Sequence, residues 1–372
     1  MENKVIILGV NHQSTLGFVR CFGEAGIKPI CIIYGSKEGL VFSSKYPSVK
    51  HYEETAEQCL NYIITHYSGL SPKPFLFGSN DTSASVINEN YNKLKKYFLT
   101  ESAKDTEGEV VRLMNKWQIY NMAEQYGLNV AKTLLLEKGN AIPSDIEFPV
   151  FVKSMRTIDG GKVDEEICRN HEELTTFMQQ CHSPQIMIQK FIDKKLEFNY
   201  YGYCSKGVHI PYENHRPRSI AGALSGYHVF VPANNNNLYR KVKSMMEATG
   251  YNGLFTAEFL VDKNGKYWFM EINFRHDGAT YLLMPGINLP MEYCKTVLGF
   301  SHGEPKIKSK KIIGIREQTD YNQSVKKGNM SITKWLKDFI TADSRILVNL
   351  HDFGPCWYII KRKLLTSCAN ES

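Results

Sequence analysis

Three polar residues lie at alternate positions of the apolar stretch FMEINFRHDG (residues 269–278): Glu271, Asn273 and Arg275. Alternate residues of a β-strand point to the same side, so a carboxylate, an amide and a guanidinium would share one face. Two interpretations follow, namely a water-facing edge strand or a site for a metal ion and phosphate. The hydrophobic residues between the polar positions favour the metal and phosphate site.

The preceding stretch, FTAEFLVDKNGKYWFMEIN, predicts how a second strand pairs with this one. Asn264-Gly265 is a strong signal for a two-residue hairpin turn, because both residues tolerate positive φ. That turn predicts these facing pairs: Lys263 with Lys266, Val261 with Trp268, and Glu258 with Glu271. The two glutamates would then have Cβ atoms about 5 Å apart.

Two carboxylates so close repel each other unless a cation lies between them. Hard oxygen ligands suit Mg²⁺, so Glu258, Glu271 and Asn273 are the predicted metal ligands. The alternative is that both glutamates face water. Arg275 extends the same face and could contact phosphate or acyl-phosphate oxygens, or form a salt bridge with the two glutamates instead.

Other anion-binding patterns are few. The sequence contains no GxxxxGK[ST] loop and no GxGxxG fingerprint, which disfavours a P-loop enzyme and a dinucleotide-dependent oxidoreductase. Lys153 ends the apolar stretch FPVFVKS and precedes Gly160 and Gly161, whose amides could help to hold phosphate. Arg216 and Arg218 precede a glycine-rich turn and are candidates for binding a substrate carboxylate, or are solvated loop residues.

The elements that must position these residues fall into three segments. Residues 4–100 alternate apolar strand-like stretches with helical patterns, which predicts a parallel α/β layer. Residues 111–127 predict one helix ending at Gly127, and the following β-rich stretches predict an α+β region. We expect domains at 1–110 and 111–300, and a basic C-terminal extension at 301–372 that packs on the body, with a membrane-surface helix as the alternative.

Composition restricts the class of protein. The chain has 372 residues, 42% hydrophobic residues and a net charge of +7, without a dense basic stripe, so we expect no nucleic-acid partner. Its nine cysteines include no CxxC pair, which favours reduced thiols and a cytoplasmic location. The N-terminus reads as a strand, and no apolar stretch is long enough to span a bilayer.

Taken together, these motifs resemble the ATP-grasp superfamily, in particular carboxylate–amine ligases with a carbamoyl-phosphate-synthase-type ATP-binding domain. The likeness covers about residues 1–300 and rests on the order and spacing of the motifs. It implies an N-terminal parallel α/β (pre-ATP-grasp) domain followed by an ATP-grasp domain of two α+β subdomains with the nucleotide between them. The sequence departs from the family at Ala131, at Phe274 and in its short glycine loop.

The resemblance also implies roles for individual residues. By their place in the motifs, the residues that would contact phosphates, adenine and ribose are Lys116 and Lys153, then backbone at Gln189, Lys190, Phe191 and Ile192, then Glu197. It implies Glu258, Glu271 and Asn273 as metal ligands and Arg275 as the arginine that stabilises the transition state.

The implied activity is an ATP- and Mg²⁺-dependent ligase, with Mn²⁺ as a substitute ion. It would convert a substrate carboxylate to an acyl phosphate and join it to an amine, with small molecules as partners and a homodimer as one option for its assembly. Two alternatives stay open: transfer to a thiol or another nucleophile, and a nucleotide-binding regulatory module without turnover.

Overall fold

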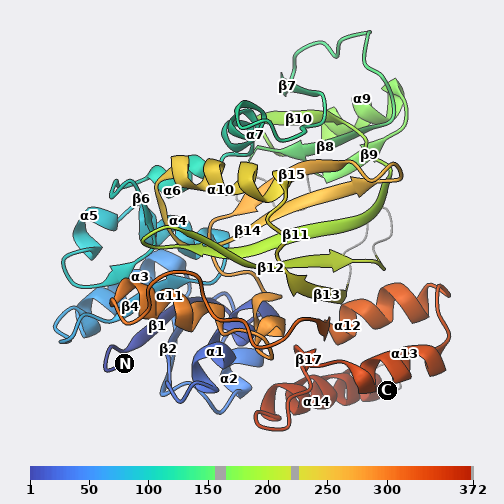
Figure 1. Cartoon of the computed structure of the whole chain (residues 1–372). Coiled ribbons are helices and arrows are strands. Elements are labelled where there is room, and N and C mark those ends of the chain that lie inside the picture. The colour runs from blue at the N-terminus through green and yellow to red at the C-terminus, as the bar shows by residue number, and fades with distance from the viewer. Residues whose placement is uncertain (156–164, 219–225, 370–372) are drawn as a thin grey trace.

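The computed structural model describes residues 1–155, 165–218 and 226–369, which form three β-sheets with helices around them (Figure 1). The first sheet is parallel and has the order β3-β2-β1-β4-β5. Its strands are β1 (Val5–Val10), β2 (Ile30–Tyr34), β3 (Val49–Tyr52), β4 (Phe75–Gly78) and β5 (Leu99–Thr100). The predicted parallel α/β layer at the N-terminus is confirmed.

Both faces of this parallel sheet are buried, which explains why its strands read as continuous apolar stretches. Val5 and Ile7 point toward α1 (Gln13–Gly23), whereas Ile6 and Leu8 point toward α3 (Ala56–Tyr67) and α4 (Asp81–Asn88). Asn80 caps α4, because its side-chain oxygen accepts a hydrogen bond from the Ser83 amide. The end of β4 and the start of α4 therefore form a fixed corner.

The second sheet is small and antiparallel, with the order β7-β10-β8-β9. Its strands are β7 (Thr133–Glu137), β8 (Val150–Ser154), β9 (Glu165–Cys168) and β10 (Gln185–Lys190). One face packs against α9 (His171–Gln180) through Val152, Ile186 and Ile188. Successive residues of a strand alternate, so Lys153 points to the opposite face.

The third sheet is large and carries most of the candidate site. It contains β11 (Lys194–Cys204), β12 (Val208–Arg216), β13 (Tyr227–Pro232), β14 (Tyr251–Asp262), β15 (Tyr267–Asn273), β16 (Ile312–Ile315) and β17 (Ser344–Arg345), and β6 (Ser102–Ala103) pairs with β14. Tyr200 points toward α10 (Asn237–Thr249), whereas Tyr201 and Tyr212 point toward the core shared with α1. The mixture of this sheet with the small one confirms the predicted α+β texture.

The single helix predicted at residues 111–127 is wrong, because the structure has two helices there. These are α6 (Glu109–Leu113) and α7 (Lys116–Gln125). Asn115 interrupts the run with an extended backbone, and its side chain accepts hydrogen bonds from the Trp117 and Gln118 amides. An asparagine inside an apolar pattern competes with the helix by capping, which a periodicity argument overlooks. Gly127 does terminate α7, with φ +73°.

Residues after 300 connect the layers. β16 pairs with β13, and α14 (Gly354–Ala369) packs on α2 (Leu40–Ser43). Buried Arg20 of α1 donates to the Asp352 carboxylate at 2.8 Å. Among the described residues, no helix has the length and apolar character needed to cross a bilayer.

Candidate active site

The hairpin of β14 and β15 does bring Glu258 opposite Glu271, but not by the predicted turn. The observed loop has three residues, since the Asp262 amide donates to Lys266 and the Gly265 amide donates to Asp262. Of the three loop residues, Lys263, Asn264 and Gly265, only Gly265 has positive φ, at +80°. The Asp262 carboxylate accepts hydrogen bonds from both the Asn264 and Lys266 amides, which stabilises this longer loop.

The longer loop shifts the register by one residue, so Val261 faces Tyr267 and Leu260 faces Trp268. The predicted pairing of Val261 with Trp268 is therefore wrong, as is that of Lys263 with Lys266. A β-bulge between Glu258 and Phe259 then restores the opposed glutamates. The longer loop and the bulge each shift the pairing by one residue in opposite directions. Glu258 therefore still faces Glu271, as predicted.

The three proposed metal ligands lie together in the structure. The Asn273 amide donates to Glu258 Oε1 at 3.0 Å. Burial raises the pKa of Glu258, the Arg216 guanidinium opposes this, and nearby Glu271 and Asp277 add to the rise. A buried carboxylate with acidic neighbours is unfavourable when ionised, and a hard cation would relieve that cost.

The donor set fits magnesium better than a soft metal. The described part of the chain contains no cluster of three or more His, Cys, Asp or Glu residues suited to a metal. Two carboxylates and an amide leave room for water and phosphate oxygens, which Mg²⁺ commonly keeps in its shell.

Lys116 and Lys153 meet on the same side of the hairpin. Lys116 is the first residue of α7, and its amide donates to Met155, directly after β8. Its Nζ lies 3.6 Å from Glu165. Burial and the nearby Lys116 together lower the pKa of Lys153 to about 8, and Glu271 and Glu165 oppose part of the change. An anionic ligand would stabilise the protonated form of Lys153, which burial disfavours.

Arg275 connects the hairpin to the N-terminal layer. Its Nε donates to Asp81 Oδ1 at 2.5 Å, and its Nη2 donates to Asn273 Oδ1 at 3.2 Å. The ion pair of Arg275 is thus with Asp81, where a salt bridge to the two glutamates was one expectation. Asp81 is the first residue of α4, shortly after the buried strand β4. A polar residue at the end of a buried strand was therefore the one feature of the sequence that could have indicated Asp81 as a site residue.

His276 follows Arg275 but does not act as a charged group. Its ring stacks on Phe18, with centroids 4.1 Å apart and an interplanar angle of 4°. Burial lowers the pKa of His276 to about 3, so the ring is neutral near pH 7.

The segment predicted to contact adenine lies at the end of β10. The Gln189 side chain donates to Thr133 Oγ1 at 2.9 Å. The Lys190 amide donates to Lys132 at 2.9 Å and the Phe191 amide to Pro149 at 3.1 Å, so these two N–H groups already serve the fold. Gly160 and Gly161, expected near phosphate, lie outside the described residues.

The structure separates the two arginines that the sequence grouped. Arg216 is buried at the end of β12 and donates to Glu197 Oε2 at 3.0 Å. Glu197 also pairs with Lys194.

Arg218 instead donates to Asp320 Oδ2 at 2.8 Å and pairs with Asp338. Its guanidinium lies 3.7 Å from the Tyr227 ring centroid. Arg216 therefore remains near the proposed ribose-binding glutamate, whereas Arg218 is bonded to residues of the C-terminal segment.

A hollow that is open to solvent brings residues from three regions together. Asp81 lines it from the N-terminal layer, Lys116 from α7, and Glu271 and Asn273 from β15. Cationic and anionic groups thus border one open space. This arrangement suits a polyphosphate together with its cation.

Comparisons with known proteins agree with this geometry. No family model matches the chain. A D-aspartate ligase from Enterococcus faecium (strain Aus0004) is 25% identical over 321 residues, which cover 76% of this chain and 74% of the relative. The solved L-amino acid ligase of Bacillus licheniformis is 15% identical with a TM-score of 0.62, covering 80% of this chain and 75% of that one.

A second solved structure contains a nucleotide. The biotin carboxylase domain of the Hydrogenobacter thermophilus 2-oxoglutarate carboxylase, in complex with MgADP, is 16% identical with a TM-score of 0.63. The match covers 84% of this chain and 74% of that one.

These matches show that the chain has the predicted ATP-grasp fold. The relatives include two amino-acid ligases and a biotin carboxylase domain with bound MgADP, which agrees with the ATP- and Mg²⁺-dependent ligase that the sequence predicts.

Proposed function

We propose that ATP binds between the small and the large sheet, with its phosphates at the hollow beside β15 and its base at the end of β10. Lys116 and Lys153 would neutralise phosphate oxygens. Since the Lys190 and Phe191 amides already donate within the fold, we assign the base to their carbonyls, to Gln189 and to Ile192. Glu197 would accept hydrogen bonds from the ribose hydroxyls.

Glu258, Glu271 and Asn273 would hold Mg²⁺, which when bound withdraws charge from phosphate oxygens. Arg275, oriented by Asp81, would stabilise the phosphoryl group during its transfer to the substrate carboxylate. The amine would then displace phosphate from the acyl group. The observation that carries this proposal is the opposed pair Glu258 and Glu271, bordered by Lys153.

We propose that Arg216 binds the carboxylate of one substrate. We also propose that one of the two substrates is an amino acid. Support comes from the burial of Arg216 beside the acidic face, and from the D-aspartate ligase relative. D-Aspartate is therefore the first amine to test, and L-aspartate is its matched control. Arg218 we assign to anchoring the C-terminal segment, not to substrate.

A phosphate-release screen tests the proposal. Pairs of amino acids and small acids are incubated with MgATP, and ADP and phosphate are measured together. ADP should form only when both partners are present, and Glu271→Gln should abolish it. Product mass distinguishes an amide from a thioester. ATP binding without ADP across the panel would favour a regulatory module.

We propose domain boundaries near residues 110 and 300, giving domains 1–110 and 111–300 and a C-terminal extension 301–372. We further propose a homodimer in the cytoplasm. Among the described residues, eight cysteines are free and seven of these are buried, which accords with a reducing compartment. Light scattering during gel filtration measures the assembly, and a mass of 42.6 kDa would indicate a monomer.

A further inference from the structure

Phe353, directly before α14, and one side of α14 itself form an exposed apolar stripe. Phe353, Trp357, Ile360 and Leu364 follow one another at steps of four, three and four residues, which places them on one side of a helix. Their exposed fractions are 46%, 56%, 39% and 60%. The stripe includes a tryptophan, a residue that suits a boundary between apolar and wet surroundings.

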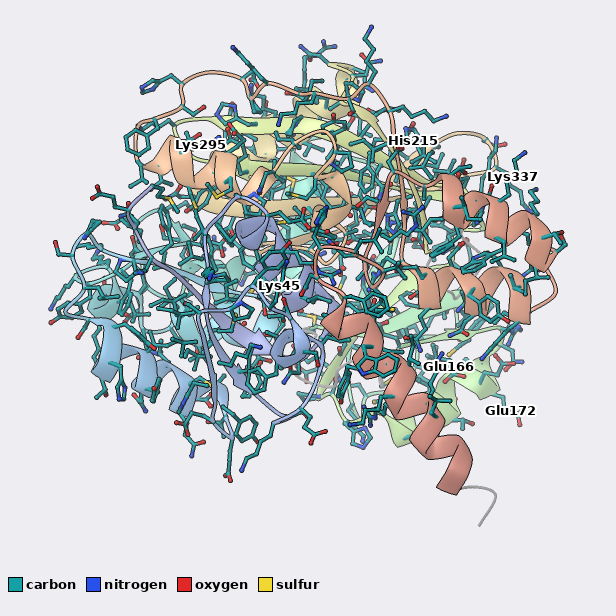
Figure 2. All side chains as sticks on the ribbon, turned by 90° about the horizontal axis from the view of Figure 1, so that it is seen from below. Lys45, Glu166, Glu172, His215, Lys295 and Lys337 are labelled. Carbon is teal, nitrogen blue, oxygen red and sulfur yellow. The ribbon has the colours of Figure 1, made fainter. Side chains whose placement is uncertain are left out.

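The other side of the helix is fixed to the protein. Tyr358 and Ile359 pack against the core that includes α1. Just before the helix, Asp352 accepts hydrogen bonds from Arg20 and from the Ser44 hydroxyl. The stripe is thus held outward at the rim of the molecule, where Figures 1 and 2 both show α14.

The region around the stripe is strongly basic. Residues 322–364 contain eight Lys or Arg residues, three Asp and no Glu. Two of the three aspartates already have cationic partners, since Asp352 pairs with Arg20 and Asp338 with Arg218. On α14 itself, Lys361 and Lys363 lie on either side of the stripe, and Gly354–Ala369 includes no acidic residue.

Helix α13 (Ile332–Thr341) repeats the same combination. Ile332, Leu336 and Ile340 are exposed at steps of four residues, and Lys337, labelled in Figure 2, borders them. An amphipathic helix with Trp or Leu on one face and Lys or Arg beside it is typical of proteins that lie on a bilayer surface.

We propose that α14 docks this ligase on an anionic phospholipid surface. The apolar stripe would enter the boundary between headgroups and acyl chains, while the lysines reach lipid phosphates. This inference does not depend on the proposed substrate roles.

A second copy of the chain fits the stripe less well. At ~200 Å² per bared side chain, four half-exposed side chains offer ~400 Å², about half of what one partner buries in a standard interface. Pairing two stripes would also bring two basic helices together without an acidic residue on either one.

Vesicle sedimentation of the full chain tests the proposal. Vesicles of phosphatidylglycerol and phosphatidylcholine should pull the protein down at low ionic strength, and phosphatidylcholine alone should not. Neutralising Lys361, Arg362 and Lys363 to Ala should weaken binding on the order of a hundredfold. Trp357→Ser with Leu364→Ser should weaken it at least ~10-fold.

Two matched controls separate α14 from general charge and general hydrophobicity. Lys308→Ala, Lys310→Ala and Lys311→Ala remove the same charge from an exposed segment outside α14. Phe300→Ser removes an apolar side chain that is 72% exposed and not on α14. Both controls should bind vesicles like the parent protein, and all variants should keep ligase turnover.

Three results would overturn the proposal. These are no sedimentation with anionic vesicles, equal loss in the α14 variants and the controls, or a dimer that Trp357→Ser dissolves in the absence of vesicle binding. The last result would assign the stripe to a second copy of the chain.

Discussion

The small and the large sheet, between which we propose that ATP binds, each hold a buried ionisable side chain there, Lys153 on one and Glu258 on the other. On the small sheet, burial lowers the pKa of Lys153 to about 8. On the large sheet, burial raises the pKa of Glu258, and Glu271 adds to the rise. Each sheet therefore holds a buried group whose charged form is disfavoured. A bound nucleotide would place its phosphates beside Lys153 and its cation beside Glu258. One binding event would thus reduce the free-energy cost of charging both buried side chains.

The largest effect should come from the acidic sheet. Glu271→Gln keeps the shape of the side chain and removes its charge, so the metal loses a ligand. We expect kcat to fall on the order of a thousandfold, while the thermal unfolding midpoint stays close to the parent value. Glu166→Gln, an exposed change on β9, is the control and should keep full turnover. Retained turnover in Glu271→Gln would contradict the metal site.

The lysine sheet should give the next largest effect, mainly in binding. Lys153→Met should weaken ATP affinity by about 10–100-fold, because a charge-assisted contact to phosphate is lost. Lys138→Met, directly after β7 of the same sheet, is the control, since its ammonium donates to the Cys181 carbonyl. Calorimetry at pH 7 measures both. Equal losses in the two variants would break the comparison between the sheets.

The pKa of Lys153 also sets a pH dependence with a definite sign. The folded protein loses this proton near pH 8, below the ordinary value of 10.5, so apo-protein stability should rise as the pH goes from about 8 toward 10.5. ATP affinity should instead fall above pH 8, where the lysine is neutral. Binding should then take up a proton, which calorimetry in buffers of different ionisation enthalpy detects, and Lys153→Met should lose this uptake.

The two neighbouring arginines provide a smaller and more specific test. Arg216→Lys retains charge but loses the planar fork, so KM for the carboxylate substrate should rise about tenfold. Arg218→Ala should leave KM unchanged and lower the unfolding midpoint, because two ion pairs with the C-terminal segment disappear. The reverse result would mean that Arg218 belongs to the substrate site.

The smallest effect concerns the hairpin loop that aligns the glutamates. Gly265 has φ +80°, and a methyl group added there would meet no atom within 4 Å, so Gly265→Ala should cost about 1 kcal/mol through backbone strain alone. Gly69→Ala meets no neighbour either, and its backbone lacks the positive φ, so it should be nearly neutral. Urea denaturation compares the two, and turnover should persist in both.

Local pattern predicted that Glu258 and Glu271 face each other on paired strands, as the structure shows. The alternation with apolar residues placed Glu271 and Asn273 on one side of the strand, and the hairpin brought Glu258 opposite Glu271. The loop length was wrong because the Asp262 side chain bonds two amides within the turn, a contact that residue types at the turn centre do not reveal. The bulge that compensated for it has no signature in the sequence.

Contacts between distant segments were beyond sequence reasoning. Asp81 and Arg275 are 194 residues apart, and Arg218 and Asp320 are 102 apart. No periodicity or spacing rule reports which charges meet after folding. The break between α6 and α7 at Asn115 could have been predicted from the sequence, because an asparagine that precedes a lysine in an apolar pattern is a helix-capping signal.

The ion pair between Arg20 and Asp352 affects how the chain folds while it is being synthesised. The guanidinium in α1 is fully buried, and its carboxylate partner is 332 residues downstream. A ribosome releases the first sheet long before it decodes Ile346, Leu347 and Asp352, whose oxygens accept the hydrogen bonds of the guanidinium, so an early α1 would leave Arg20 in contact with water. The N-terminal layer can therefore reach its final compactness only near the end of translation.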